Sequence, residues 1–97
     1  MLFVIIGKDG PEGTQKRLLH REAHLKRLAE KDREGKIILA GPLTDKTGSL
    51  IVLEADSLEE AQTFANQDPY TTFGVFQEVT VHPFKQVFPG TPGTEGS

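Results

Sequence analysis

The stretch KIILAGPLTDKTGSLIVLEA, residues 36–55, decides the fold of this chain. Two apolar, β-branched runs stand at its ends, and between them lie Gly41, Pro42 and the turn-forming residues LTDKTG. Apolar runs of strand length on either side of turn chemistry predict two antiparallel strands joined by a loose connection. The chain on either side of this hairpin then determines which layers cover it.

Helical patterns flank the hairpin on both sides. Residues 14–34 carry apolar side chains at three- and four-residue spacings, which predicts a helix that ends near Gly35. The expected buried stripe of this helix is Leu18, Leu25, Leu28 and Ala29. After the hairpin, Ser57 and Glu60 form a capping box that predicts a second helix start. The expected stripe there is Leu58, Ala61, Phe64 and Ala65, and Asp68-Pro69 ends the helix because a residue before proline avoids helical geometry.

Two further strands complete the pattern. LFVII, residues 2–6, reads as a buried strand, and residues 75–88 read as an extended segment with Pro83 at an edge, a bend or a bulge. The order β-α-β-β-α-β predicts an α+β, ferredoxin-like fold: a four-stranded antiparallel sheet with two helices on one face. Because two strands are apolar at successive positions, we expect a second copy of the chain to cover the other face, which makes a homodimer.

Length and composition narrow the class of protein. The 97 residues suffice for one domain, which we place at 1–88, followed by a disordered Pro/Gly-rich tail at 89–97. A net charge of −3, with 11 basic and 14 acidic residues mixed along the chain, argues against nucleic acid as a partner. No cysteine is present, and the longest apolar run is too short to cross a membrane. We therefore expect a cytoplasmic protein, and we assign its one basic cluster to a solvated helix face: Lys16, Arg17, Arg21, Lys26 and Arg27.

His20 and His24 are four residues apart on the first helix, a spacing that helical zinc sites use. A zinc site of that kind needs a glutamate directly after the first histidine, and Arg21 stands there instead, so a metal site is disfavoured. At 100° per residue His24 lies about 120° from Leu18, at the edge of the apolar stripe, where it can point into a cleft. His20 lies further round, and we expect it in water.

Several other residues have both a structural and a functional interpretation. Asp68 before proline is typical of a chain turn, but a carboxylate can also orient a histidine for acid–base chemistry. Gly41-Pro42 is typical of a strand end, although glycine also allows a ligand to approach the backbone closely. Tyr70 and Phe73 can line a pocket or fill a core, and core is the simpler interpretation.

Four segments together closely resemble one family. REAHLKRL, GKIILAGP, ADSLEEAQTFANQDPY and GVFQEVTVHPFKQVF, in this order, resemble the YciI-like (YCII-related) proteins from Met1 to about Phe88. The resemblance implies a dimeric α/β-barrel arrangement and a pocket in which His24 and Asp68 form a catalytic dyad. One related branch removes chloride from chlorinated hydroxyhydroquinones, and the wider superfamily includes muconolactone isomerases. The short LTDKTG connection departs from members that carry a longer insertion there, which puts the identity of the substrate in doubt.

From these observations we predict a homodimeric lyase or isomerase that acts on a small aromatic or anionic compound. His24 is the expected general acid or base, oriented by Asp68, and Arg21 is the expected anchor for an anion. Gly41, Pro42 and Tyr70 are expected to shape the pocket. This chemistry requires neither a cofactor nor a metal. The alternative is a non-catalytic ligand-binding or accessory protein on the same scaffold, since fold alone does not decide function.

Overall fold

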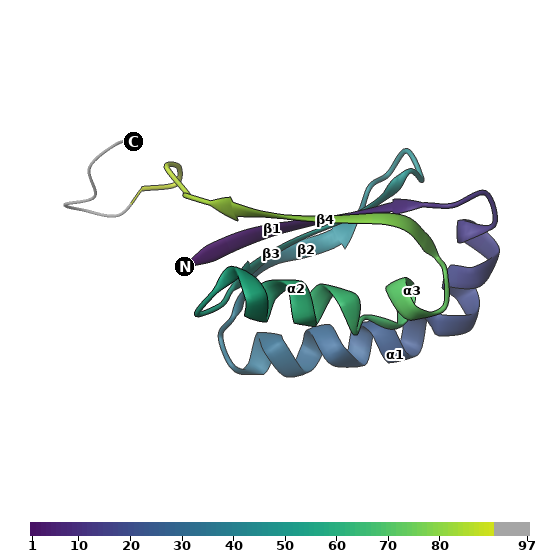
Figure 1. The fold of residues 1–97 in the computed structure, drawn as a ribbon, viewed down its shortest axis with the longest axis horizontal. Helices are drawn as coiled ribbons and strands as arrows, with labels where there is room; N and C mark the ends of the chain where they lie inside the picture. The colour runs from purple at the N-terminus through teal and green to yellow at the C-terminus, as the bar shows by residue number, and fades with distance from the viewer. Residues whose placement is uncertain (91–97) are drawn as a thin grey trace.

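The computed structural model describes residues 1–90, in which four strands and three helices follow one another (Figure 1). The elements in chain order are β1 (Leu2–Asp9), α1 (Gly13–Arg33), β2 (Ile37–Pro42), β3 (Gly48–Glu54), α2 (Leu58–Asn66), α3 (Pro69–Thr72) and β4 (Phe76–Phe84). The predicted β-α-β-β-α-β order is confirmed, with one short additional helix before the last strand. The proposed tail, 89–97, lies outside the described residues from position 91 onward.

The strands form one antiparallel sheet in the order β2-β3-β1-β4. The hairpin of residues 36–55 supplies β2 and β3, which pair from Ile37↔Leu53 to Pro42↔Ser49. β1 is a central strand and pairs with both β3 and β4. Pro83 lies in β4 at the edge of the sheet, where a missing backbone N–H is tolerated. This is the ferredoxin-like arrangement that the sequence predicts.

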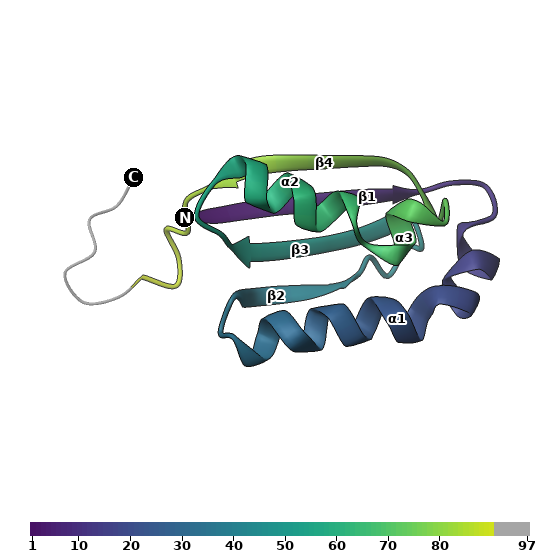
Figure 2. The ribbon, with the colours of Figure 1, turned by 60° about the horizontal axis from the view of Figure 1, so that its bottom comes forward.

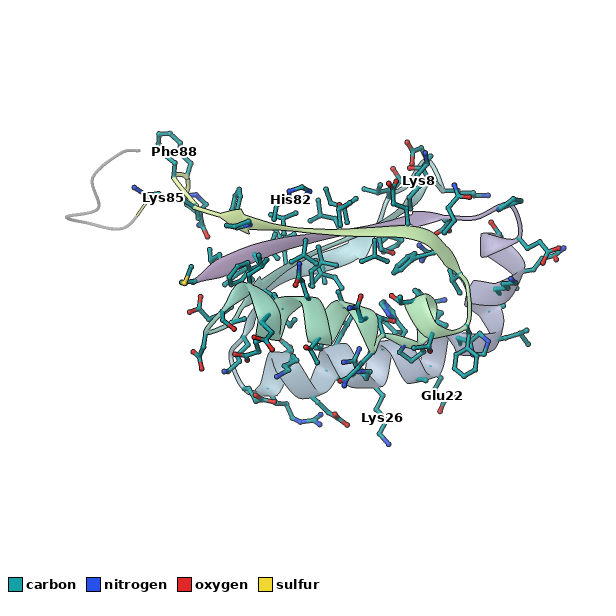
Figure 3. The ribbon with its side chains drawn as sticks, in the orientation of Figure 1. Lys8, Glu22, Lys26, His82, Lys85 and Phe88 are labelled. Atoms are coloured by element: carbon teal, nitrogen blue, oxygen red, sulfur yellow. The ribbon has the colours of Figure 1, made fainter. Side chains whose placement is uncertain are left out.

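All three helices lie on one face of the sheet, and the other face is bare (Figure 1). α1 runs alongside β2 at one edge of the sheet, whereas α2 runs along β1 and β4, nearer the other edge (Figure 2). On the bare face, the side chain of His82 rises from β4 away from the helices (Figure 3). Within residues 1–90, no helix is both long and apolar enough to span a membrane.

The main core lies between the sheet and α2. Its buried members come from β1, β3 and α2: Phe3, Ile5, Ile51, Leu53, Ala55, Ala61, Phe64 and Ala65. Three of the four residues expected on the α2 stripe belong to this core, but Leu58 is exposed. A smaller cluster of Tyr70, Val75 and Phe76 lies under α3. Of these three residues, Tyr70 also lines the groove beside α1.

Local signals in the sequence set the helix ends. α1 ends at Arg33, and Gly35 follows in the left-handed conformation with φ 75°, which glycine adopts at little steric cost. At the start of α2 the Ser57 hydroxyl accepts a hydrogen bond from the Glu60 backbone N–H at 3.1 Å. The Glu60 carboxylate in turn accepts from the N–H of Asp56, one residue earlier than an ideal capping box requires.

The buried apolar stripe that we predicted for α1 is wrong. Leu18 is 76% exposed, Leu25 is 47% exposed and Ala29 is exposed, and only Leu28 packs against the core. The helix instead buries Gly13 and His24. Paired polar groups, rather than the leucines, determine how α1 is rotated about its axis, because His24 and Arg17 have buried partners on other elements.

The basic cluster of α1 is only partly a solvated face. Lys26 points away from the body, as does the neighbouring Glu22 (Figure 3). Arg27 turns inward, donates to the Phe64 carbonyl at 3.1 Å and lies 4.3 Å from the centre of the Phe64 ring. Arg17 is also directed inward, towards Asp9. Two of the five cations therefore hold α1 against its neighbours.

Candidate acid–base site in the groove beside α1

The segment Asp68-Pro69-Tyr70 forms the start of α3. Asp68 is extended (φ −62°, ψ 132°), as expected before proline, and Pro69 occupies the first turn, where a helix does not need its N–H. The Asp68 carboxylate accepts a hydrogen bond from the Tyr70 backbone N–H at 2.8 Å and so caps the helix. The cap fixes the position of a carboxylate that is 3% exposed.

That carboxylate also contacts His24. His24 Nδ1 lies 2.8 Å from Asp68 Oδ1 and 2.9 Å from Oδ2, and the imidazole is only 6% exposed. A carboxylate in this position accepts hydrogen bonds, so Nδ1 carries the proton when the imidazole is neutral, and Nε2 keeps its lone pair. The expected position of His24 at the edge of the stripe is corrected here: the ring is buried, and its partner is the Asp68 that the sequence analysis named.

The two histidines of α1 stack on two aromatic rings of the α3 segment. The His24 and Tyr70 rings have centres 3.9 Å apart and planes within 8°, and those of His20 and Phe73 have centres 4.1 Å apart and planes within 3°. His20 is therefore half-buried against Phe73 rather than in water, as we had expected. Phe73 is largely exposed on its other side, so the core interpretation is wrong for this residue.

Sequence reasoning missed a second polar network beside the first. Arg17 Nε donates to Asp9 Oδ2 at 2.7 Å, and Arg17 Nη2 donates to Asp9 Oδ1 at 2.9 Å and to Ser49 Oγ at 2.8 Å. The hydrogen bonds that Arg17 donates to the Asp9 carboxylate raise the pKa of Arg17, against the opposing effect of burial. The only signal in the sequence was an acid at the end of β1, eight positions before an arginine.

These groups surround a groove between α1 and the β2–β3 hairpin, with a volume of about 400 Å³. Its apolar lining is Leu18, Leu25, Leu28, Ala40, Pro42 and Ile51. Its polar lining is Thr14, Arg17, Arg21, His24, Ser49 and Tyr70. A concave, mainly apolar site of this size with a few converging polar groups is typical of small-molecule sites.

The groove brings together nearly all the site residues that the sequence analysis named. His24, Arg21, Gly41, Pro42 and Tyr70 all line it, and Asp68 stands behind His24. Gly41 and Pro42 are the last two residues of β2, as expected of a strand end, and a Cβ at Gly41 would meet no atom within 4 Å.

Tyr70 is almost fully buried in the structure and lies at one end of the groove. Its ring meets Phe76 edge-on at 5.6 Å, and the Arg17 guanidinium lies 5.0 Å from the ring centre. Burial raises the pKa of Tyr70, although the charges of Arg17 and Arg21 oppose this rise. The phenol therefore keeps its proton at neutral pH and can donate a hydrogen bond.

A second hollow of similar size, about 410 Å³, lies between α1 and α2. Its charged rim includes Arg27 and Lys31, but Arg27 is already bonded to the Phe64 carbonyl. It has no buried acid–base pair comparable to His24 and Asp68. Nowhere in residues 1–90 do three or more histidine or acidic side chains gather as a metal site would require. The groove beside α1 is therefore the candidate active site.

The fold and the groove define a class: a ferredoxin-like α+β domain with a buried histidine–carboxylate pair beside a small-molecule-sized cavity. The YCII-related domain model matches residues 1–85, and the chain belongs to this family. Protein YciI of Escherichia coli O6:H1 is 42% identical over 91% of this chain and its own full length. An uncharacterized protein of Haemophilus influenzae is 39% identical with the same coverage.

A solved structure extends the comparison to a relative with a named activity. The 5-chloro-2-hydroxyhydroquinone dehydrochlorinase TftG of Burkholderia phenoliruptrix, in complex with 2,5-dihydroxybenzoquinone, is 35% identical and superposes with a TM-score of 0.79. The similarity covers 88% of this chain and 94% of that one.

Proposed function

We propose that this protein is a small-molecule lyase or isomerase in which His24 and Asp68 form a general acid–base pair. The observation that carries the proposal is the buried contact between His24 Nδ1 and Asp68, at 2.8 Å, with the same imidazole lining the groove. A histidine held through one nitrogen by a carboxylate can take and return a proton through the other. Asp68 stabilises the imidazolium formed in between.

The substrate class is a small oxygenated ring. The groove has the volume for one ring with substituents, apolar walls for its faces, and Arg21 at its rim as a cation for a phenolate or carboxylate. Arg17 is a weaker candidate anchor because Asp9 already balances its charge. The similarity to a dehydrochlorinase that binds a dihydroxybenzoquinone supports rings of the hydroquinone type.

On a chlorinated hydroxyhydroquinone the proposed chemistry balances without a cofactor. His24 Nε2 accepts a ring hydroxyl proton and returns it to the chlorinated carbon. His24, neutral again, then accepts a second hydroxyl proton while chloride departs with the electron pair of the C–Cl bond, which leaves a quinone. The organic product is oxidised at the expense of the C–Cl bond, so no external oxidant takes part.

We also propose that the protein works as a homodimer with the bare sheet face covered by a second copy. Ile6, Leu39 and Phe84 are large apolar side chains on the strands that remain partly exposed in the single chain. Burial of such a surface against its own copy stabilises a dimer through the hydrophobic effect. Light scattering coupled to gel filtration tests this: a mass near twice 10.7 kDa supports the dimer, and a monomer at micromolar concentration contradicts it.

The second candidate function is ligand binding without catalysis. It is favoured by the capping role of Asp68, because a buried residue that starts α3 has a structural reason to be there. A screen of small ring lactones and chlorinated hydroquinones separates the two functions, with wild type and His24→Ala tested side by side. Turnover that is lost in His24→Ala supports the enzyme, whereas binding without turnover supports the ligand-binding protein. Equal turnover by both proteins removes His24 from the mechanism.

A further inference from the structure

Tyr70 is the only tyrosine of the chain, and it contacts both polar networks of the site. One face of its ring stacks on His24 at 3.9 Å, and its edge meets Phe76. The Arg17 guanidinium lies 5.0 Å from its centre. Contacts with His24, Phe76 and Arg17 thus hold the Tyr70 ring in place, and a residue that only lines a pocket does not need so many contacts.

The surroundings of the hydroxyl group constrain where its proton can point. The Arg17 guanidinium lies 5.0 Å from the centre of the Tyr70 ring, so it is the cation nearest to this phenol for which a contact is seen. A guanidinium carries only hydrogen-bond donors, so it can bond to the phenol oxygen only through a lone pair of that oxygen and leaves the hydroxyl proton unused. Within residues 1–90 no protein acceptor forms a hydrogen bond with the Tyr70 hydroxyl, so its proton is free to meet a ligand in the groove.

Arg17 is itself held in place. Asp9 binds it through two hydrogen bonds and Ser49 through a third, so the guanidinium is oriented before any ligand arrives. Bidentate contacts of this kind fix an arginine geometrically as well as by charge. Asp9 neutralises Arg17, which leaves Arg21 as the cation at the groove that has no ion-pair partner among the described residues.

We propose that Tyr70 is a second catalytic residue, which donates a hydrogen bond from its hydroxyl to the substrate oxygen that becomes negatively charged. This inference rests on the proposed function, since it assigns a partner to the proton transfer at His24. When His24 removes the proton of one ring hydroxyl, negative charge spreads to the conjugated oxygens of the ring. Tyr70 stabilises one such oxygen, and Arg21 supplies the compensating charge.

The proposal requires a neutral phenol, and the site favours one. Burial disfavours the phenolate more strongly than the two arginines favour it, so the pKa of Tyr70 is raised. A ligand oxyanion that accepts the hydroxyl proton as a hydrogen bond should raise this pKa further, because it interacts favourably with the protonated form only.

The test measures binding of 2,5-dihydroxybenzoquinone by calorimetry to wild type, Tyr70→Phe and the double variant Tyr70→Phe/Phe73→Tyr. We expect Tyr70→Phe to bind about 10- to 100-fold more weakly, because a hydrogen bond to a charged oxygen is lost. The double variant moves the hydroxyl group to the exposed face of the α3 segment and should bind as weakly as Tyr70→Phe. Binding to Tyr70→Phe within twofold of wild type overturns this assignment and leaves the proposed function intact. Failure of the wild type to bind the quinone overturns both.

A measurement on the unmutated protein avoids any effect of mutation on folding. Because the chain has one tyrosine, carbon-13 labelling of its Cζ gives a single NMR signal that reports whether the phenol is ionised. We expect saturation with the quinone to shift the midpoint of this titration to higher pH. Binding with an unchanged midpoint, or with a midpoint moved to lower pH, contradicts a donating Tyr70.

Discussion

Replacement of Asp68 separates its structural role from its chemical role. The carboxylate makes two kinds of contact: it caps α3 through the Tyr70 N–H, and it accepts from His24 Nδ1. Asp68→Ala removes both, whereas Asp68→Asn keeps one oxygen, at the Oδ1 position that both donors contact, and replaces the charged Oδ2 with an amide NH2 group. The two variants should therefore affect stability and activity in different proportions.

The expected magnitudes follow from these contacts. Loss of an N-cap costs about 1 kcal/mol, and a buried His24 N–H left without an acceptor costs about 2 kcal/mol. Asp68→Ala should then lower the free energy of unfolding by about 3 kcal/mol, which lowers the Tm of a domain of this size by roughly 12–24 °C. Asp68→Asn should cost about 1 kcal/mol, but it should reduce turnover by about 10- to 100-fold, since the imidazolium loses its charged partner.

Urea unfolding and thermal melts measure the first effect, and initial rates on a substrate from the panel measure the second. Asp32→Ala is the matched control, because Asp32 is an exposed acid on α1, and we expect it to change stability by less than about 0.5 kcal/mol. If Asp68→Ala is no less stable than Asp32→Ala, the buried contact with His24 does not exist in solution. If Asp68→Asn keeps full activity, the charge of Asp68 has no part in the chemistry.

Three further predictions concern the surroundings of the pair. Because burial raises the pKa of Tyr70, stability should be full below the ordinary phenol value of 10.0 and decline as pH rises from there towards the folded pKa. Urea midpoints above pH 10 should show this decline in wild type and lack it in Tyr70→Phe. Arg17→Met should cost roughly 2 kcal/mol because it leaves the buried Asp9 carboxylate without its donors, and a urea midpoint equal to that of wild type would contradict the network. Gly7→Ala should cost about 1–3 kcal/mol, because its Cβ would overlap the Phe76 ring and displace it, and an unchanged Tm argues against this packing.

Much of the fold could be predicted from local signals. The hairpin of residues 36–55, the cap formed by Ser57 and the stop at Asp68-Pro69 all act over a few residues, so the chain displays them without tertiary information. The rotation of α1 could not be predicted in this way. Its leucines point to an apolar stripe, but the buried face is chosen by partners of His24 and Arg17 on other elements.

The candidate site was partly predictable for the same reason. Asp68 was named through a family resemblance, and geometry then placed it 2.8 Å from His24. The Asp9–Arg17–Ser49 network carries no spacing motif, because its members lie on β1, α1 and β3 and meet only when the sheet forms. The stack of His20 on Phe73 was missed because Phe73 is an exposed residue directly after a four-residue helix, where no periodic pattern exists.

The most direct test of the central claim compares chloride release from 5-chloro-2-hydroxyhydroquinone by wild type, His24→Gln and His20→Gln. Both variants lose a stacked imidazole of the same helix, but only His24 lines the groove and contacts Asp68. Loss of a general acid–base residue should lower the rate of His24→Gln by about 100- to 10,000-fold. His20→Gln should stay within about threefold of wild type, a difference of less than 1 kcal/mol. Equal rates for His24→Gln and wild type would contradict the account.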